Sequence, residues 1–240
     1  MTTNTLNVKI ERGTQNQKET ELFEVPAYEN QTVLDVVSWV QQYKDPTLTY
    51  RFACRVGMCG SCVMMVNDIP RWTCRTHISK VLKGNEVTIA PLRNLPVIKD
   101  LAVDMDNFFD KWVEAEGIHH SSATRHDEIA AIDENSAERV EANSGIECIN
   151  CSVCYAACDT VANNPDFLGP AALQRAWTLL NDAKDSGRDS ILDAVSGRGG
   201  CHNCHSIGSC TTYCPNELNP MSAIASLKKE TAKNMFRRRK

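Results

Sequence analysis

The sequence lacks any segment that would carry the chain into a membrane by itself. None of its apolar runs approaches the roughly 18 residues that span a bilayer. Its first residues, MTTNTLNVKIERGTQ, contain neither a basic start nor an apolar signal core. We therefore expect any membrane role to come through a partner, and we expect the chain to reside in a reducing compartment.

The sequence also lacks an excess of basic charge. Its 26 Lys and Arg residues are outnumbered by 30 Asp and Glu residues, so the formal net charge is -4 and gives no indication of nucleic-acid binding. With 42% hydrophobic, 23% charged and 6% aromatic residues, the composition is that of a soluble globular protein. A length of 240 residues allows one large domain or two small ones.

Cysteine, in contrast, is abundant. Four of the 12 cysteines lie at Cys54, Cys59, Cys62 and Cys74, none follows until Cys148, and eight crowd into the last part of the chain. In a reducing compartment such cysteines are metal ligands rather than disulfide partners. Disulfides stay an alternative only if the chain is exported by a route that its N-terminus does not reveal. The two groups of cysteines predict two modules, residues 1–105 and residues 106–240.

The first module has the pattern of a small mixed sheet covered by one helix. Apolar and polar residues alternate in three predicted half-buried strands, around Leu6, Val8 and Ile10, around Phe23 and Val25, and around Val87 and Ile89. Between them the spacing of Val33, Val36, Val37 and Val40 predicts an amphipathic helix. Strands before and after one helix indicate an α+β module.

Strand patterns disappear in the second module. The stretch GPAALQRAWTLL places Leu173, Ala176, Trp177 and Leu180 on one helix face, with Pro170 near the first turn. Asn219-Pro220 predicts another helix start, leading into Ile224 and Leu227. The polar stretch 114–147, near the start of the second module, is expected to be a connection that contains short helices.

The first cysteine motif is Cys54-x4-Cys59-x2-Cys62-x11-Cys74. This is the plant-type spacing for a [2Fe-2S] cluster, in which three thiolates come from one tight loop and the fourth comes from a neighbouring element. Glycines in the loop, Gly57 and Gly60, allow the backbone to curl so that amide groups point at the sulfurs. Zinc is the alternative, but zinc sites usually contain two separate C-x2-C pairs.

The second motif is Cys148-x2-Cys151-x2-Cys154-x3-Cys158. It matches the bacterial two-cluster run, in which the first three cysteines bind one cubane and the fourth binds the other cluster. The proline that usually follows the fourth cysteine is replaced by Asp159. Proline contributes no ligand atom, so this departure affects the local turn more than the cluster.

The third motif, Cys204-x5-Cys210-x3-Cys214-Pro215, is the same run with Ile207 where a second cysteine is expected. If the crossed arrangement holds, Cys214 completes a [4Fe-4S] site with Cys148, Cys151 and Cys154. The remaining thiolates, Cys158, Cys204 and Cys210, cannot bind a fourth iron. The motif therefore predicts a [3Fe-4S] cluster with Ile207 filling the vacated corner and a raised reduction potential.

Two other interpretations of this stretch use Cys201. The sequence Cys201-x-x-Cys204-His205 satisfies the pattern for covalent haem attachment, which takes place outside the cytosol. Alternatively, Cys201 supplies the missing ligand and completes a second [4Fe-4S] cluster, although it lies on the wrong side of Cys204 for the run. The simplest role for Cys201 is that of a small buried hydrophobe.

With these motifs in place, the sequence resembles the iron-sulfur subunit of succinate dehydrogenases and quinol:fumarate reductases. The resemblance is carried by ACRVGMCGSCVMMVN, CINCSVCYAAC, NPDFLGPAAL and CHSIGSCTTYCPNELNP, and it covers nearly the whole chain. It implies an N-terminal β-grasp ferredoxin domain of the plant [2Fe-2S] type, followed by an all-α helical ferredoxin domain. The same ligand roles follow from the family, with Cys201 left over.

The resemblance also implies partners and an electron path. The partners are a flavoprotein subunit with FAD, where succinate and fumarate interconvert, and a transmembrane anchor that binds quinone and often haem b. Single electrons would pass from flavin through [2Fe-2S], [4Fe-4S] and [3Fe-4S] to quinone, or in reverse. The chain would then lie at the cytoplasmic face of the inner membrane, held by the anchor, with no substrate site of its own.

The family places polar residues near the quinone, and His205 and Lys228 are the candidates in this sequence. The stretch YAACDTVANNPDF lacks the tryptophans of many ubiquinone-linked relatives, which favours a menaquinone-linked fumarate reductase. The physiological direction, the quinone type, the haem content and the oligomeric state stay open. Other hypotheses are a soluble two-domain ferredoxin, an iron-sulfur subunit of another flavin dehydrogenase without a quinone partner, and a zinc-organised interaction module.

Overall fold

The computed structural model describes residues 5–129 and 131–238. The chain forms two compact units. The first consists of Met1–Met105 together with Ile149–Ala157, and the second consists of Asp106–Cys148 and Cys158–Lys240. The short segment 149–157, which carries two of the predicted ligands, therefore packs with the N-terminal unit although it is distant in sequence.

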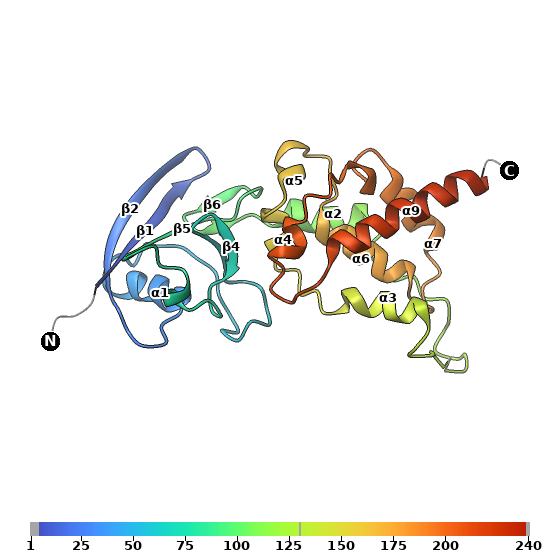
Figure 1. Ribbon diagram of the computed structural model, residues 1–240, viewed down its shortest axis with the longest axis horizontal. Coiled ribbons are helices and arrows are strands. Elements are labelled where there is room, and N and C mark those ends of the chain that lie inside the picture. The colour runs from blue at the N-terminus through green and yellow to red at the C-terminus, as the bar shows by residue number, and fades with distance from the viewer. Residues whose placement is uncertain (1–4, 130, 239–240) are drawn as a thin grey trace. The chain divides into compact units, whose positions relative to one another are not determined.

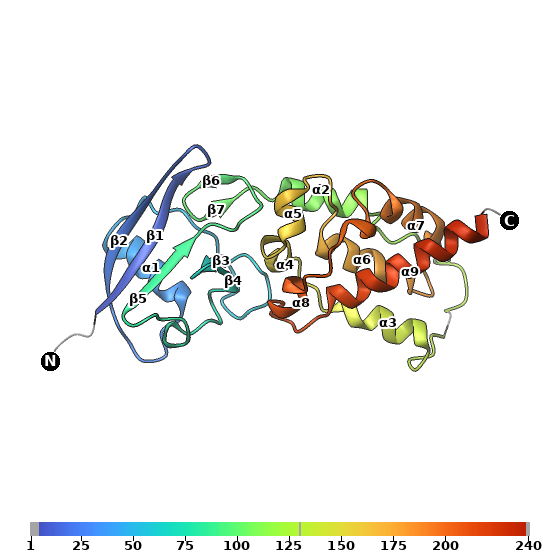
Figure 2. The ribbon, with the colours of Figure 1, turned by 45° about the horizontal axis from the view of Figure 1, so that its top comes forward.

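The first unit is built on a five-stranded sheet with the strand order β2-β1-β5-β3-β4 (Figure 1; β3 is labelled in Figure 2). Its strands are β1 (Thr5–Thr14), β2 (Gln17–Pro26), β3 (Val63–Val66), β4 (Ile69–Trp72) and β5 (Glu86–Ala90), beside a small sheet of β6 (Val97–Lys99) and β7 (Ala102–Val103). Its helical elements are α1 (Val33–Tyr43), the 3-10 turn η1 (Ile78–Lys80) and α4 (Val153–Ala156). β1 and β5 pair in parallel and the other neighbours pair antiparallel. This is the expected β-grasp fold.

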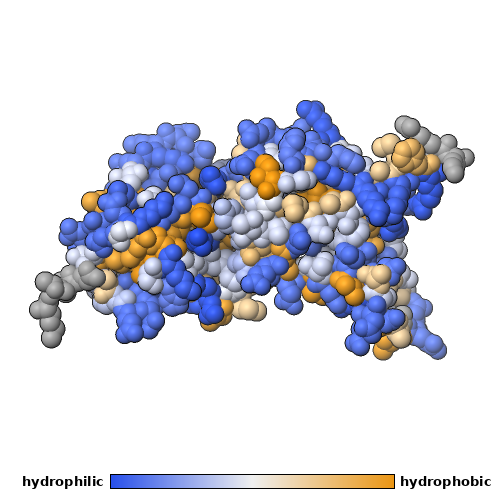
Figure 3. Space-filling model, in the orientation of Figure 1, coloured by the Kyte–Doolittle hydropathy of each residue, from blue (hydrophilic) through white to orange (hydrophobic). Residues whose placement is uncertain are grey.

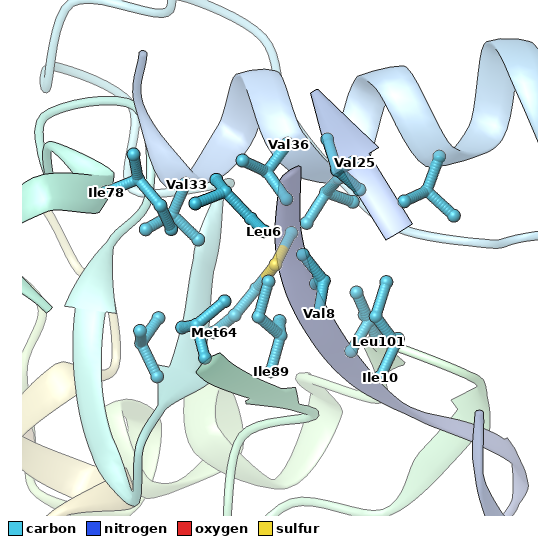
Figure 4. Close-up of a cluster of buried hydrophobic side chains, with 14 of the residues drawn as sticks. Leu6, Val8, Ile10, Val25, Val33, Val36, Met64, Ile78, Ile89 and Leu101 are labelled. Atoms are coloured by element: carbon cyan, nitrogen blue, oxygen red, sulfur yellow. The ribbon is translucent and has the colours of Figure 1, made fainter. Parts of the chain in front are cut away.

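The core of the first unit lies between α1 and the sheet. Figure 4 shows Val33 and Val36 from α1 in one cluster with Leu6, Val8 and Ile10 from β1. All five side chains are at most 3% exposed. The predicted helix and the predicted strand alternation around these residues are confirmed, because alternate β1 residues point at the helix and every third or fourth α1 residue points back.

The hairpin of β3 and β4 was missed at the sequence level. All four residues of β3, the run VMMV, are buried, so the strand does not show the alternation by which the other strands are recognised. A short run that is buried on both sides cannot be told from a helix segment by periodicity. The hairpin matters because it connects Cys62 to Cys74.

A buried ion-pair network extends the core face of β1 beyond its apolar residues. Arg12 is 7% exposed, and its Nε lies 3.0 Å from Oδ1 of Asp100. It also pairs with Asp45 and Glu21. The carboxylate of Asp100 accepts the backbone amide of Thr49 at 2.9 Å. This network therefore anchors the chain just before the first cluster loop.

The second unit is helical. Its elements are α2 (Asp106–Glu114), α3 (Ala137–Ile146), α5 (Asp159–Asn163), α6 (Pro170–Leu180), α7 (Arg188–Ser196), the 3-10 turn η2 (Cys201–Asn203), α8 (Ser209–Thr212) and α9 (Pro220–Arg238) (Figure 2). Within the described part of this unit the only β-type pairing is an isolated bridge between Ser121 and Asp185. The all-α helical domain after the β-grasp domain agrees with the sequence analysis.

Helix α6 lies at the centre of the second unit. It begins at Pro170 as predicted, and it packs against α3, α7 and α9. The sequence predicted one apolar face, but ten of its 11 residues are buried, including Gln174. Helix α9 also begins at the predicted Pro220 and buries Ile224 and Leu227. Helix α9 also packs against η2 and α8, the short helical elements directly before and within the third cysteine motif.

The surface is mainly polar. Figure 3 shows hydrophilic side chains over most of the visible face, with hydrophobic ones in small separate areas. None of the helices in residues 5–129 and 131–238 has the length and apolar composition required to cross a membrane.

Candidate iron-sulfur cluster sites

The first predicted cluster loop, residues 54–62, curls around the sulfur of Cys54. The backbone amides that donate to Cys54 Sγ are those of Val56 at 3.5 Å, Met58 at 3.3 Å and Cys59 at 3.3 Å. Hydrogen bonds from backbone amides to the sulfurs of a cluster tune its reduction potential. The loop thus has the amide groups that a cluster requires.

This curl depends on left-handed backbone conformations. Gly57 has φ +76° and Gly60 has φ +70°, as expected of glycines in such a loop, and Arg55 also has a positive φ of 59°. The ring of Trp72 lies against Gly57, at 3.0 Å from the position that a Cβ would occupy. A side chain at Gly57 would therefore meet both backbone strain and the indole ring.

The fourth cysteine of the first motif is brought back by the β3-β4 hairpin. Val63 pairs with Trp72, and the hydroxyl of Thr73 donates to the carbonyl of Cys62 at 2.7 Å. Cys62 and Cys74 are 4% and 7% exposed. The hairpin explains the spacing of 11 residues, because two paired strands and their turn return the chain to its starting point.

Helix α1 holds the same region from the other side. Its first N–H groups lack partners within the helix, and two of them donate to carbonyls on either side of Cys74. Leu34 N bonds to Thr73 O at 3.2 Å, and Val33 N bonds to Thr76 O at 2.9 Å. The side chain of Leu34 packs against Cys62 and Cys74. The start of α1 therefore positions the fourth predicted ligand.

Two thiols of this set are shifted in opposite directions. The hydroxyl of Ser61, followed by the backbone amide of Cys54, lowers the pKa of Cys59 to about 6. Burial, followed by the neighbouring Cys62, raises the pKa of Cys74 to about 11. The thiolate is the form that binds metal, so cluster binding at this set releases the thiol protons.

Two middle cysteines of the second motif, Cys151 and Cys154, lie in the segment that packs with the first unit. The residues on both sides of Cys151 have left-handed backbone conformations, with φ 58° at Asn150 and 62° at Ser152. Cys154 lies in the short helix α4. Alternating hand is typical of loops that turn amide groups toward one side.

The other two cysteines of the predicted [4Fe-4S] set, Cys148 and Cys214, lie in the second unit. Their segments approach each other there, because Nδ2 of Asn216 donates to the carbonyl of Glu147 at 2.6 Å. Glu147 directly precedes Cys148, and Asn216 follows Cys214 closely in the chain. The sequence does not reveal this bond, because the two residues are far apart in the chain.

The chain at Asp159 turns into a short helix. Cys158 is the N-cap of α5, and Asp159 is its first residue. Proline is favoured at the first helical position because its φ is already helical, and an acidic residue is favoured there by the helix dipole. Aspartate can therefore replace the proline of the common run without loss of the helix start.

The three cysteines of the third predicted site line one pocket. Its described lining consists of Cys158, Asp159, Thr160, Phe167, Pro170, Cys204, Ser206, Ile207, Gly208, Ser209, Cys210 and Ile224. Burial raises the pKa of Cys210 to about 11, with a further contribution from Cys158 and Cys204. Burial also raises the pKa of Cys158. The backbone amide of Ser206 donates to Cys204 Sγ at 3.4 Å. Cys210 is buried, and Cys158 and Cys204 are partly buried. Three such thiols around one pocket, with an amide aimed at one sulfur, suit a cluster site.

Ile207 lies at the mouth of this pocket. It lines the pocket, yet it is 58% exposed, and the neighbouring Ser206 and Gly208 have φ values of 58° and 88°. The apolar residue that replaces the expected cysteine thus stands at the site, in a loop with left-handed turns on both sides.

Cys201 does not belong to the described lining of that pocket. It is 0% exposed, and its sulfur lies 3.8 Å from Oγ1 of Thr231 on α9. Burial raises its pKa. These surroundings fit the role of a small buried hydrophobe. His205, the histidine of the haem-attachment pattern, is exposed.

Lys228, the second predicted quinone neighbour, is tied to the third site by a hydrogen bond that the sequence does not reveal. Its Nζ donates to the carbonyl of Cys204 at 2.6 Å. No periodicity or motif relates these residues, which lie on α9 and directly after η2. The bond places a cation next to a predicted ligand.

Within the described residues, no three His, Cys, Asp or Glu side chains gather around one point as the ligands of a single ion do. A cluster does not require that arrangement, because its irons are separate and each thiolate binds one of them.

Two family models match the chain in the order that the cysteine motifs suggest. Residues 6–110 match a 2Fe-2S iron-sulfur cluster binding domain, and residues 147–219 match a 4Fe-4S dicluster domain. Together the two matches contain all 12 cysteines.

Similar proteins are found along most of the chain. The fumarate reductase iron-sulfur subunit of Haemophilus influenzae is 34% identical over 88% of this chain and 86% of its own length. The corresponding subunit of Mycobacterium tuberculosis is 34% identical over 90% and 87%. A mitochondrial succinate dehydrogenase [ubiquinone] iron-sulfur subunit of Oryza sativa subsp. japonica is 36% identical over 82% and 70%.

The fold has a counterpart among solved structures. A chain of the Mycobacterium smegmatis Sdh1 complex in the apo form superimposes with a TM-score of 0.85, at 24% identity and over 98% of both chains. The fold, the two domain matches and the relatives agree, and the chain belongs to the family of iron-sulfur subunits of fumarate reductases and succinate dehydrogenases.

Proposed function

We propose that this chain is an electron relay between a flavoprotein subunit with FAD and a membrane quinone. Its clusters would be arranged in the order [2Fe-2S], [4Fe-4S] and [3Fe-4S]. When bound, each cluster supplies a one-electron redox centre. The chain would thereby couple succinate oxidation or fumarate reduction to a quinone, two reactions that each exchange two electrons.

The proposed ligands follow from the cysteine spacing together with the two domain matches. The [2Fe-2S] cluster is held by Cys54, Cys59, Cys62 and Cys74, the [4Fe-4S] cluster by Cys148, Cys151, Cys154 and Cys214, and the [3Fe-4S] cluster by Cys158, Cys204 and Cys210. Cys201 is not a ligand in this assignment, in keeping with its burial against Thr231.

One observation carries the proposal furthest, namely the pocket lined by Cys158, Cys204, Cys210 and Ile207. Three thiols and an isoleucine match a cluster that has lost one iron. Removal of one thiolate also removes a negative charge, which raises the reduction potential. Such a site suits the last acceptor before a quinone.

The flavoprotein is proposed to dock at the first cluster loop. Phe52, Val56 and Met58 are apolar residues in or beside this loop, and they are 40%, 59% and 68% exposed. Exposed apolar groups of this kind are typical of protein interfaces. An electron that enters here has only the loop itself to cross before it reaches the proposed [2Fe-2S] ligands.

The quinone and the membrane anchor are proposed to lie at the third site. Ile207 is exposed there, His205 is exposed beside it, and Lys228 reaches the carbonyl of Cys204. An ammonium group has three donors, so Lys228 can keep this bond and donate to a quinone oxygen as well. In this proposal the anchor holds the chain at the cytoplasmic face of the inner membrane, the quinone is menaquinone, and haem b belongs to the anchor.

The proposal is tested by EPR of the air-oxidised protein and an iron count on the same sample. A [3Fe-4S] cluster is paramagnetic when oxidised, whereas [2Fe-2S] and low-potential [4Fe-4S] clusters are then silent. We expect a sharp signal and about nine irons per chain. The variant Ile207→Cys places a thiol midway between Cys204 and Cys210 and so restores the C-x2-C-x2-C spacing. It should therefore lose the signal and gain about one iron.

A silent oxidised sample with about ten irons would contradict the assignment, because it would mean that another group already completes a second cubane. Cys201→Ala is the matched control. It removes the one cysteine that is not assigned as a ligand, and the oxidised signal should persist in this variant.

A further inference from the structure

Gly60 marks a close approach between two of the cysteine motifs. A Cβ built on Gly60 would lie 2.7 Å from Cβ and 2.8 Å from Cα of Cys151. Real Cβ atoms do not approach carbon atoms so closely, and one of the two atoms is backbone, so neither a rotamer change nor a side-chain shift would relieve the overlap. The backbone of the first cluster loop therefore touches Cys151 directly, and it does so only because residue 60 has no side chain.

The segment that carries Cys151 is held at this place by further bonds within the first unit. Nδ2 of Asn94 donates to the carbonyls of Tyr155 and Ala156, at 2.9 and 3.4 Å. Tyr155 and Ala156 are both 2% exposed, and α4 packs against β4. The contact at Gly60 is thus part of an ordered packing of the segment 149–157 and not a chance approach of two loops.

The backbone conformation of Gly60 does not by itself explain why glycine stands there. Gly84 has a similar φ of +65°, but a Cβ at Gly84 would meet nothing within 4 Å. Asparagine adopts the same conformation at residues 30, 67, 94 and 150. Only glycine satisfies both the conformation and the contact with Cys151.

We propose that Gly60 is the contact through which an electron passes from the first cluster-binding motif to the second. This inference rests on the proposed function, because it requires Cys59 and Cys151 to be ligands of different clusters. Gly60 directly follows Cys59, so the covalent path from Cys59 to Gly60 is short. A single van der Waals gap separates that path from Cys151. Gly60 is in this sense a positioning residue for both ligands.

The proposed step is the transfer of one electron between two clusters. One electron leaves the [2Fe-2S] cluster, which is oxidised by one equivalent, and it enters the [4Fe-4S] cluster, which is reduced by one equivalent. No bond forms or breaks, and the step requires no proton. The role of this chain is to keep the two binding segments in contact.

The test compares three variants in the assembled, cluster-loaded complex. Gly60→Ala pushes the segments apart. Asn94→Gly removes the bonds to Tyr155 and Ala156 while it keeps a residue that tolerates the positive φ of 66° at this position. Gly84→Ala is the control, since it introduces the same backbone strain without a neighbour.

Two quantities are measured. The first is the microwave power that half-saturates the EPR signal of the reduced [2Fe-2S] cluster, which rises when a second paramagnetic centre lies close by. The second is the rate at which the [4Fe-4S] cluster becomes reduced after a rapid mix with the electron donor. We expect Gly60→Ala and Asn94→Gly to lower the half-saturation power and to slow the transfer several-fold, with Gly84→Ala like the unchanged protein.

The inference is overturned if both variants behave like Gly84→Ala. It is equally overturned if only one of them differs from Gly84→Ala, because local strain in one loop would then explain the change in half-saturation power and transfer rate. An iron count on each sample distinguishes a failure of the proposed function from a failure of the role of Gly60. A complex that never contains the clusters contradicts the proposed function, whereas a fully loaded complex with unchanged coupling contradicts only the role of Gly60.

Discussion

At the scale of single residues, the chain uses buried charge to fix the start of the first cluster loop. Arg12 continues the inward register of Leu6, Val8 and Ile10, so a cation occupies a place where alternation alone predicts an apolar side chain. It is accommodated because Asp45 and Asp100 pair with it. A buried charge is tolerated only with partners of this kind.

The first prediction concerns the acid sensitivity of this network. The hydrogen bond from Arg12, followed by the bonds from Thr47, lowers the pKa of Asp45 to about 2. Because the pKa is lower in the folded state, the unfolded state binds the proton first on acidification. The stabilisation by Asp45 is therefore complete above the unfolded pKa near 3.9 and is lost as the pH falls toward about 2.

We expect Asp45→Asn to lower the free energy of unfolding by about 1 to 2 kcal/mol at pH 6, and we expect this difference from the unchanged protein to shrink below pH 4. Urea unfolding at a series of pH values measures both quantities. A difference that stays constant from pH 6 to pH 3 would mean that the ion pair does not contribute.

At the scale of elements, helix α1 shows how one helix serves both the core and the site. Its capping box joins Thr32 and Asp35, with Asp35 N donating to Thr32 Oγ1 at 3.2 Å and Thr32 N donating to Asp35 Oδ2 at 2.9 Å. Two further amides of the first turn, those of Val33 and Leu34, bond to carbonyls beside Cys74. The cap of α1 therefore helps to position Cys74, a predicted ligand.

The second prediction tests the cap. Thr32→Ala removes the side-chain acceptor and should destabilise the protein by about 1 kcal/mol. Because the first turn of α1 also holds residues 73 and 76, the [2Fe-2S] absorbance should disappear at a lower urea concentration in this variant. Thr32→Ser retains the hydroxyl and should restore most of both quantities. Loss of the cap without any change in cluster retention would separate α1 from the site.

At the scale of the whole molecule, the segment 149–157 makes the first unit discontinuous in sequence. Val153, Tyr155 and Ala156 are buried there, and Asn94 bonds to the carbonyls of the segment. A domain that includes a distant piece of chain loses buried area when that piece is removed, which lowers its stability.

The third prediction follows from this discontinuity. A fragment of residues 1–105, loaded with its cluster, should unfold at a lower temperature than the first unit does in the full chain. A loss of 1 kcal/mol corresponds to about 4–8 °C for a domain of this size. The cluster absorbance monitors the first unit in both proteins. Attachment of residues 149–157 through a flexible linker should recover part of the difference, and no recovery would mean that the segment does not stabilise this unit.

Much of the fold could be predicted because it depends on local pattern. The strand around Leu6, the helix around Val36 and the start of α6 at Pro170 follow from periodicity and from the residue types that begin helices. The β3-β4 hairpin could not be predicted in the same way, since a short strand that is buried on both faces has no alternation. A hint was available in the spacing itself, because the 11 residues between Cys62 and Cys74 have to return the chain to its starting point.

For the sites, the sequence alone determined which cysteines form motifs, which position of the third motif lacks a thiol, and which family these spacings resemble. Ligand spacing is a local property, because it is limited by the reach of a few residues around one cluster. The tertiary structure decided what lies beside those motifs, namely Lys228 at the carbonyl of Cys204, Thr231 at Cys201 and Cys151 against Gly60. These contacts join residues that are far apart in the chain, and they arise only when the helices and strands pack, so no pattern within one segment contains them.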